Sequence, residues 1–319
     1  MKKIAQVVVA TLSNAPSPKT VSSAAQDALR SFSNDSGPQD LEIHRGMCAR
    51  VQRELGTVQL ERHRVQMQES SIAGVAVRVF TPAEIPVENR DRVLLNLHGG
   101  GFTVDAGSVT ENAPIAAYAR MTVVAARYRL APEHPFPAAV DDAEAVYRAL
   151  VAEHTADRIG LYGTSAGACL CAQLLVRLRH TGCPLPRAFG FFTGTADLSR
   201  SGDSEFFFRP AGETASITDQ FSEYVGGRDR LSPQISPIFS DLKGFPPTLC
   251  IAGTRDFMLS QTALFHHALL RSGVDARVLV FEAMPHAHWI FLDLPESDQA
   301  FRAMANFFER TLASAVPQT

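Results

Sequence analysis

The sequence predicts an α/β fold in which a mainly parallel central sheet has helices on both faces. The first observation is that short apolar runs alternate with longer helical segments from about residue 70 onward. The second is that runs such as DRVLLNLH (91–98) are almost continuously apolar, as in strands covered on both faces. The third is glycine-rich sequence directly after two of these runs, at 98–101 and 163–167. Repeated strand–helix alternation favours parallel pairing.

The elements of the N-terminal half follow from local periodicity. The first 60 residues have a helical pattern and precede a strand-rich stretch, so we expect them to pack over the sheet as part of a cap. The stretch 72–80 alternates apolar and polar positions like a half-exposed strand. Pro137 marks a helix start, because proline fits the first helical turn. The expected elements are helices at 22–32 and 44–55, strands at 72–80 and 91–98, a helix near 113–120, a strand at 121–130 and a helix at 136–153.

The C-terminal half repeats the alternation with one interruption. Between Leu198 and about Ile238 the chain is rich in Ser, Gly and Phe, which suits an insertion better than a core layer. The sequence has no internal repeat, so we expect one domain over residues 1–319. The expected strands are 158–163, 187–194, 247–253 and 276–283, with helices at 166–180, near 260–271 and at 295–313.

The composition excludes some classes of partner. Of the 319 residues, 30 are basic and 33 acidic, and the two signs are intermixed to give a formal net charge of −3. Because no basic block is present to neutralise phosphates, we expect no nucleic-acid partner. No apolar run approaches the roughly 20 residues of a membrane span, so we expect no membrane-spanning segment.

The cysteines and the N-terminal sequence indicate in which cellular compartment the protein is expected. Five cysteines without a CxxC spacing favour reduced, buried thiols over a disulfide framework. The N-terminal MKKIAQVVVATLSNA resembles a signal peptide, but its apolar core is short and interrupted by Gln6. We therefore expect an uncleaved terminus and a cytoplasmic protein.

A candidate nucleophile lies between a predicted strand and a predicted helix. The segment GTSAG at 163–167 fits G-x-S-x-G in the strand–turn–helix context of a nucleophile elbow. In so tight a turn, side chains two positions before and after the serine would collide, which explains Gly163 and Gly167. The turn lifts the Ser165 hydroxyl above the sheet at a helix N-terminus, where negative charge is favoured.

The three glycines after His98 are a second feature that fits a nucleophilic serine. Acyl transfer from an ester places a full negative charge on the former carbonyl oxygen, and fixed backbone N–H groups can stabilise it. A Cβ on this loop would block the approach of the main chain. We expect the N–H groups of Gly100, Gly101 and Ala166 to form this oxyanion hole, and His98 to brace the loop by hydrogen bonding.

A serine hydroxyl needs a base, and the base needs an orienting acid. In this kind of fold they follow in the order serine, acid, histidine. Asp256 comes just after the predicted strand at 248–252, and His286 just after the strand at 277–282. Both therefore fall at the carboxyl ends of strands, where open α/β sheets assemble their sites.

Several alternatives remain beside these assignments. His288 could replace His286 as the base, and Asp197 or Asp203 could replace Asp256 as the acid, although both precede or lie within the insertion. The cysteines at 169 and 171 are expected to be small buried side chains rather than nucleophiles. The His-Ala-His pattern at 286–288 lacks a companion His/Asp cluster, so we expect no metal site.

The chain resembles the bacterial hormone-sensitive-lipase-like esterases, a family with the α/β-hydrolase fold. The resemblance covers roughly residues 70 to 310 and is carried by HGGGF (98–102), YRLAPEHPFPAAVDDA (128–143), GTSAG (163–167), DLSRSGDS (197–204), SPIFSDLKGFPPTLCIAGTRD (236–256) and MPH (284–286). Thr164 before the serine matches the Thr-containing, GTSAG-type subgroup.

The resemblance implies a serine carboxylesterase acting on carboxylic esters of short to medium acyl chains. It implies Ser165 as nucleophile, Asp256 as acid and His286 as base, with no metal or organic cofactor. It also implies a cap built from about 1–60 and about 198–238, and dimers are common in the family. The sequence leaves open an amidase or arylformamidase on the same scaffold; a non-catalytic small-molecule receptor is disfavoured because such receptors lack the base.

Overall fold

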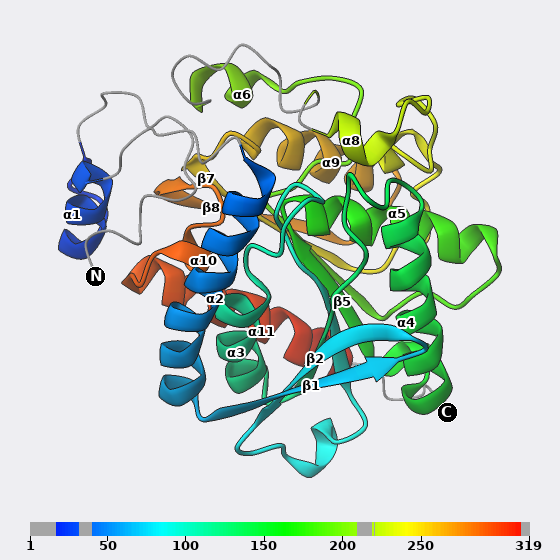
Figure 1. Cartoon of the computed structure of the whole chain (residues 1–319), viewed down its shortest axis with the longest axis horizontal. Coiled ribbons are helices and arrows are strands. Elements are labelled where there is room, and N and C mark those ends of the chain that lie inside the picture. Colours follow the sequence, from blue (N-terminus) through cyan, green and yellow to red (C-terminus); the bar gives the residue numbers. More distant parts are fainter. Residues whose placement is uncertain (1–16, 32–39, 209–218, 220, 314–319) are drawn as a thin grey trace.

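An eight-stranded sheet forms the centre of the molecule in the computed structural model, which describes residues 17–31, 40–208, 219 and 221–313 (Figure 1). Its strand order is β1-β2-β4-β3-β5-β6-β7-β8. The β1–β2 and β2–β4 pairs are antiparallel and all other neighbours are parallel. The strands are β1 (Val65–Ile72), β2 (Val75–Pro82), β3 (Val93–Leu97), β4 (Thr122–Ala126), β5 (Ile159–Thr164), β6 (Ala188–Phe192), β7 (Thr248–Arg255) and β8 (Ala276–Pro285).

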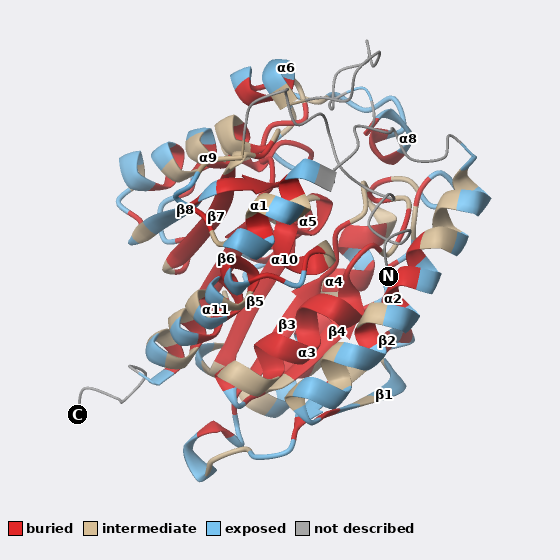
Figure 2. Ribbon diagram, turned by 90° about the vertical axis from the view of Figure 1, so that its left-hand side faces the viewer, coloured by how far each residue is buried: buried red, intermediate tan, exposed pale blue. Residues whose placement is uncertain are grey.

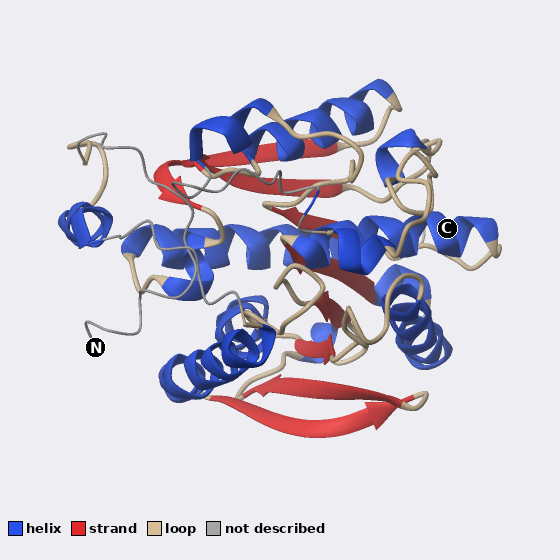
Figure 3. Ribbon diagram, turned by 45° about the horizontal axis from the view of Figure 1, so that its top comes forward, coloured by secondary structure: helices blue, strands red, loops and turns tan. Residues whose placement is uncertain are grey.

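Helices cover both faces of this sheet (Figure 3). One face packs against α3 (Ser108–Ala119), α10 (His288–Phe291) and α11 (Pro295–Ala313). The other face packs against α4 (Ala138–His154), α5 (Ala166–His180) and α9 (Leu259–Arg271). The central strands β3, β5 and β6 are buried along their whole length (Figure 2), as expected for parallel strands between two helical layers. The predicted fold class is confirmed.

Two further helices stand at the N-terminus, α1 (Ser23–Ser31) and α2 (Leu41–His63), and α2 packs along α3. The segment 198–238 carries only short helices among its described residues, α6 (Asp203–Phe208) and α8 (Ser222–Val225). The signal-peptide-like segment 1–15 lies outside the described residues, as do 32–39 and 209–218 of the two expected cap segments. Within the described ranges, no helix combines the length and apolar character needed to cross a bilayer.

The predicted strand at 72–80 was wrong at its start. Ala73 and Gly74 form a turn with φ values of 50° and 83°, and a separate strand, β1, precedes it. The sequence pattern missed β1 because Gln66, Glu69 and Ser70 face solvent on an edge strand, which leaves little apolar signal. The helix predicted near 113–120 begins earlier, at Ser108, whose amide is capped by the Asp105 carboxylate at 3.0 Å.

Candidate active site

Ser165 occupies the turn between β5 and α5 in an unusual backbone conformation. Its φ is 60° and its ψ is −122°, a combination that side-chain-bearing residues rarely adopt. A Cβ on Gly163 would lie 2.3 Å from the backbone of Gly167, and one on Gly167 would lie 1.9 Å from the carbonyl oxygen of Leu97. Both glycines are therefore needed for the tight turn that holds the serine above the sheet.

The structure brings Ser165, His286 and Asp256 into one hydrogen-bonded chain. The Oγ of Ser165 lies 3.0 Å from Nε2 of His286, and Nδ1 of His286 lies 2.9 Å from Oδ1 of Asp256. Asp256 follows β7, His286 follows β8, and the Asp256 side chain is fully buried. Because a carboxylate only accepts, Nδ1 carries the ring hydrogen, which leaves Nε2 free to accept from the serine hydroxyl.

Two further groups hold the acid, and sequence reasoning identified neither. Thr193, directly after β6, donates its hydroxyl to Oδ2 of Asp256, and its Oγ1 lies 3.0 Å from Nδ1 of His286. The amide of Met258 donates to Oδ1 of Asp256 at 2.8 Å. The ring of Phe257 stacks on the imidazole of His286 with 4.2 Å between ring centroids. The only signal for Thr193 was its position at the carboxyl end of a strand beside β7.

The three glycines after His98 differ in what a side chain at each position would meet. A Cβ on Gly99 would lie 2.7 Å from the carbonyl oxygen of Thr164, so this residue packs directly on the elbow. Gly100 has a φ of +122° and a Cβ there would lie 2.0 Å from the carbonyl oxygen of Val104. Gly101 has a φ of +61°, but a Cβ there would make only an ordinary contact of 3.8 Å with Oγ1 of Thr103. The loop can therefore lie close to the elbow only with glycine at positions 99 and 100.

Within the described part of the chain, the amide groups predicted to bind an oxyanion have no hydrogen-bond acceptor. Among the hydrogen bonds of the described residues, none uses the N–H of Gly100 or Gly101. Ala166 is the first residue of α5, where amides have no partner within the helix. Gly100, Gly101 and Ser165 line the same pocket.

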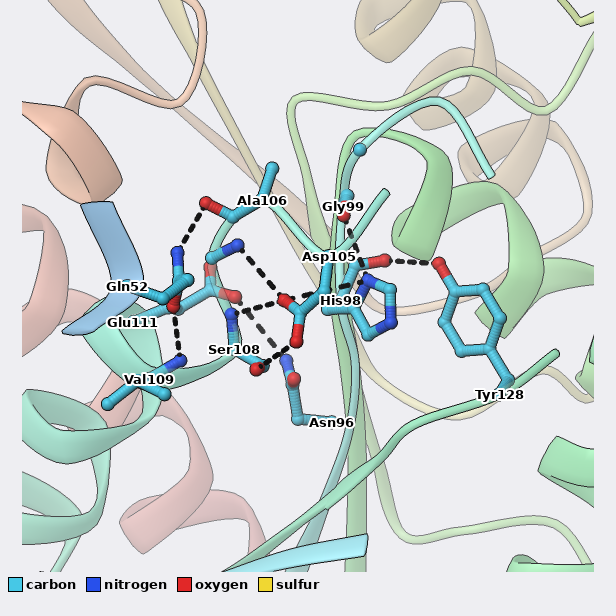
Figure 4. A network of polar contacts seen from close by, with 12 residues as sticks. Gln52, Asn96, His98, Gly99, Asp105, Ala106, Ser108, Val109, Glu111 and Tyr128 are labelled. Carbon is cyan, nitrogen blue, oxygen red and sulfur yellow. Dashed lines mark hydrogen bonds and ion pairs between the residues drawn. The ribbon is translucent and has the colours of Figure 1, made fainter. Parts of the chain in front are cut away.

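His98 is a structural part of the loop, as expected for a bracing residue (Figure 4). Its Nδ1 donates to the carbonyl oxygen of Gly99 at 2.9 Å, and its own carbonyl accepts from the hydroxyl of Tyr128 at 2.7 Å. The two rings stack with 4.2 Å between centroids. Since His98 is only 1% exposed, its imidazole does not reach the pocket.

Side chains from α2 fix the other end of the glycine loop. Gln52 donates to the carbonyl of Ala106 at 2.6 Å and accepts from the amide of Val109 at 2.7 Å (Figure 4). Arg45 donates to the carbonyl of Thr103 at 2.8 Å and forms a bidentate ion pair with Glu133. The N-terminal helix is thereby tied to the loop that borders Ser165.

The alternative candidates for the base and the acid lie in other environments. Burial lowers the pKa of His288 to about 4, although backbone groups of Glu296 and Pro285 act in the opposite direction. Asp197 accepts from Ser199 and pairs with Arg200. Asp203 begins α6.

The thiols near the elbow are buried and poorly ionised. Desolvation raises the pKa of Cys169 and Cys171 well above the ordinary thiol value. Because the thiolate is the reactive form, these side chains pack as small apolar groups rather than as nucleophiles.

A pocket of about 310 Å³ opens onto the serine. Apart from Ser165 and His286 it is bordered mainly by the glycine loop and apolar side chains, together with His44 of α2, whose pKa is lowered by partial burial. The lining residues include His44, Gly100, Gly101, Val104, Ala106, Phe221, Phe257, Met258, Ile290 and Phe291. Trp289 is 2% exposed and fills the core.

The fold and this site define an α/β hydrolase, and a family model described as an alpha/beta hydrolase fold matches residues 94–290. The chain is 35% identical over 234 residues to an acetyl-hydrolase of Streptomyces hygroscopicus, covering 71% of this chain and 78% of that protein. It is 30% identical over 250 residues to the carboxylesterase NlhH of Mycobacterium tuberculosis, covering 72% of this chain and 76% of that one.

Solved structures point to the same family. The structure of esterase E25 superimposes with a TM-score of 0.83 at 30% identity, covering 94% of this chain and 97% of that one. An esterase from the bacterial hormone-sensitive lipase family gives a TM-score of 0.77 at 30% identity, covering 87% and 93%. The chain belongs to the bacterial hormone-sensitive-lipase-like esterases, as its motifs predicted, and it is a carboxylic ester hydrolase.

Proposed function

We propose that this esterase cleaves carboxylic esters of short to medium acyl chains through an acyl-enzyme on Ser165. The observation that supports it most is the hydrogen-bonded chain from Ser165 through His286 to Asp256, with distances of 3.0 Å and 2.9 Å. A hydroxyl, a correctly oriented imidazole and a buried carboxylate are the parts that nucleophilic acyl transfer requires.

The first half of the reaction forms the acyl-enzyme. Ser165 Oγ attacks the ester carbonyl carbon while His286 Nε2 accepts the hydroxyl proton. Asp256 stabilises the resulting imidazolium through its bond to Nδ1. His286 then gives this proton to the alcohol oxygen as its bond to the carbonyl carbon breaks. The alcohol leaves, and the acyl group stays bonded to Ser165 Oγ. In the second half, His286 accepts a proton from a water molecule as the water oxygen attacks the acyl carbon. The acyl–Oγ bond then breaks, His286 gives its proton to Ser165 Oγ, and the carboxylic acid is released.

The negative charge of each tetrahedral intermediate is placed against the amides of Gly100, Gly101 and Ala166. A fixed donor of this kind contributes about 3 kcal/mol to transition-state stabilisation. The N-terminus of α5 adds the favourable end of its dipole at the same point.

The size and borders of the pocket support the substrate class. Its volume of about 310 Å³ is at the small end of the range of roughly 300–1,000 Å³ for ligand sites, and its walls are largely apolar. His44 from α2 and Phe221 from the segment 198–238 both line it. We infer that these two segments form a cap on a single catalytic domain and limit the length of the acyl chain.

The test is a series of p-nitrophenyl esters from acetate to palmitate, assayed with the wild type and S165A. We expect kcat/KM to be highest at short to medium chains and S165A to lose turnover at every length. An organophosphonate should label Ser165 covalently. Retained turnover in S165A would refute the mechanism, and faster cleavage of the matching p-nitroanilides would indicate an amidase instead.

A further inference from the structure

A carboxyl group lies buried immediately behind the elbow without an ion-pair partner among the described residues. Glu111, on α3, is 0% exposed. Desolvation raises its pKa to about 7, although hydrogen bonds from Thr164, Trp289 and Asn96 act in the opposite direction. A buried carboxyl without a cation is costly, and the mechanism above does not use it. The contacts of this side chain indicate what it does.

Three donors converge on the Glu111 carboxyl, each from a segment that carries a different part of the site. Oε1 accepts a short hydrogen bond from the Thr164 hydroxyl and another from the Trp289 indole at 2.9 Å. Oε2 accepts a longer one from Asn96 Nδ2 at 3.4 Å (Figure 4). Thr164 immediately precedes Ser165, Trp289 lies three residues after His286, and Asn96 lies on β3, which leads into the glycine loop.

The direction of the neighbouring hydrogen bonds requires an acceptor at position 111. The hydroxyl of Tyr162 donates to Oδ1 of Asn112 at 2.5 Å, and Nδ2 of Asn112 donates to Oδ1 of Asn96 at 3.0 Å. This fixes the Asn96 amide so that its NH₂ group points to Glu111. Since an indole can only donate, Trp289 also needs an acceptor. A carboxylate at position 111 accepts hydrogen bonds from Asn96, Trp289 and Thr164 without a change in the direction of any of these bonds.

We propose that Glu111 is a positioning residue of the esterase, which fixes the nucleophile elbow, the histidine loop and the glycine loop relative to one another through Thr164, Trp289 and Asn96. The proposal rests on the proposed function, because it assumes that Ser165, His286 and the glycine amides act together. Glu111 is fully buried and does not line the pocket, so it acts through these partners rather than on the substrate.

The test compares kcat and KM for p-nitrophenyl acetate in E111Q, T164V and T164S. In E111Q the new NH₂ group would face the NH₂ group of Asn96, and in T164V the hydroxyl is lost at nearly constant shape. We expect kcat to fall roughly tenfold to a hundredfold in both, with KM nearly unchanged, because small displacements of reacting groups have effects of this size. T164S keeps the hydroxyl and should restore most of kcat.

Y147F is the matched control. Tyr147, fully buried on α4, donates its hydroxyl to the carbonyl of Pro184 at 2.8 Å in the core on the other face of the sheet. Y147F therefore removes one hydrogen bond of a buried tyrosine without touching the network around Glu111. We expect a lowered melting temperature with kcat near that of the wild type. In the double variant E111Q/T164V the two reductions in kcat should not multiply, because both substitutions act on the same hydrogen bond between Thr164 and Glu111.

Wild-type kcat in E111Q and T164V would overturn the proposal, and so would a loss of kcat in Y147F as large as that in E111Q. If E111Q does not fold, the comparison of T164V with T164S decides. Failure of the proposed function is a separate result: it would appear as retained turnover in S165A. An inactive S165A with fully active E111Q and T164V would refute only the positioning role.

Discussion

The Nε2 atom of His286 lies 3.0 Å from Oγ of Ser165, although a second histidine stands only two positions further along the chain. His288 is instead buried in the layer of α10 and α11, and burial lowers its pKa to about 4. A neutral ring that is 1% exposed cannot exchange protons with a substrate in the pocket. The structure thus separates the two histidines by position and by environment.

We therefore predict opposite results for the two histidines. H286N should lower kcat at least about a thousandfold, because it removes the base, with the fold retained. H288N should keep kcat within about tenfold of the wild type and should lower the melting temperature, because it changes only packing in the interior. Both predictions are checked by measuring kcat with p-nitrophenyl butyrate and the melting temperature of each variant. A larger loss of kcat in H288N than in H286N would reassign the base.

Thr193 gives a second prediction, since its hydroxyl donates to the carboxylate that orients the base. T193V keeps the branched shape but leaves that oxygen of Asp256 without its donor. A hydrogen bond to a charged group is worth about 1.5–3 kcal/mol, so kcat should fall roughly tenfold to a hundredfold. T193S retains the donor and should remain close to the wild type. Equal activity of T193V and T193S would show that the Met258 amide alone suffices to hold Asp256.

These two cases show which parts of the site can be predicted from the sequence. Ser165, Asp256 and His286 each follow a strand with a clear apolar pattern, so their place at one edge of the sheet was predictable. The glycines at 163 and 167 are explained by a local steric rule, which needs no knowledge of distant residues. The sequence therefore contains the information for the elbow and for the loops that meet it.

Other parts depend on partners far away in the chain. Glu111 and Trp289 are 178 residues apart, and Thr193 and Asp256 are 63 apart. The sequence TEN at 110–112 is not typical of a buried helix, so its burial is visible only after α3, β5 and α10 are packed together. The same holds for Gln52, whose contacts with the start of α3 require the N-terminal helix to be in place.

The glycine loop gives a third prediction, because two adjacent glycines differ in the space around them. In G100A the new methyl group would meet the carbonyl oxygen of Val104 at 2.0 Å, in a φ region closed to alanine. The loop must shift, so we expect kcat to fall by about a hundredfold to a thousandfold, the effect of losing an oxyanion donor. G101A has no such clash and needs only the left-handed region, which costs alanine about 1–2 kcal/mol.

G101A should accordingly lose stability but keep most of its kcat. The comparison uses kcat with p-nitrophenyl acetate and the free energy of unfolding of each variant. If both variants lose kcat equally, the Gly101 position is as intolerant as the Gly100 position, and the steric account of the loop is wrong.

The fourth prediction concerns pH and uses the single tryptophan of the chain. Burial raises the pKa of Glu111 to about 7 from an ordinary 4.5, and the nearby charge of Asp105 acts in the same direction. The folded protein therefore holds this proton up to about pH 7, whereas the unfolded chain releases it near 4.5. The contribution of Glu111 to the free energy of unfolding should consequently fall as pH rises between these values.

Two measurements test this prediction. Denaturant unfolding at about pH 5 and about pH 8 should show a decrease in stability in the wild type that is smaller in E111Q. The fluorescence of Trp289, whose indole donates to Glu111, should change with a midpoint near pH 7. His288, with ring centroids 5.0 Å apart, also contacts this indole, but its pKa of about 4 separates the two effects. A transition near pH 7 that persists unchanged in E111Q would belong to another group and would contradict the assignment, because the amide side chain of that variant cannot titrate.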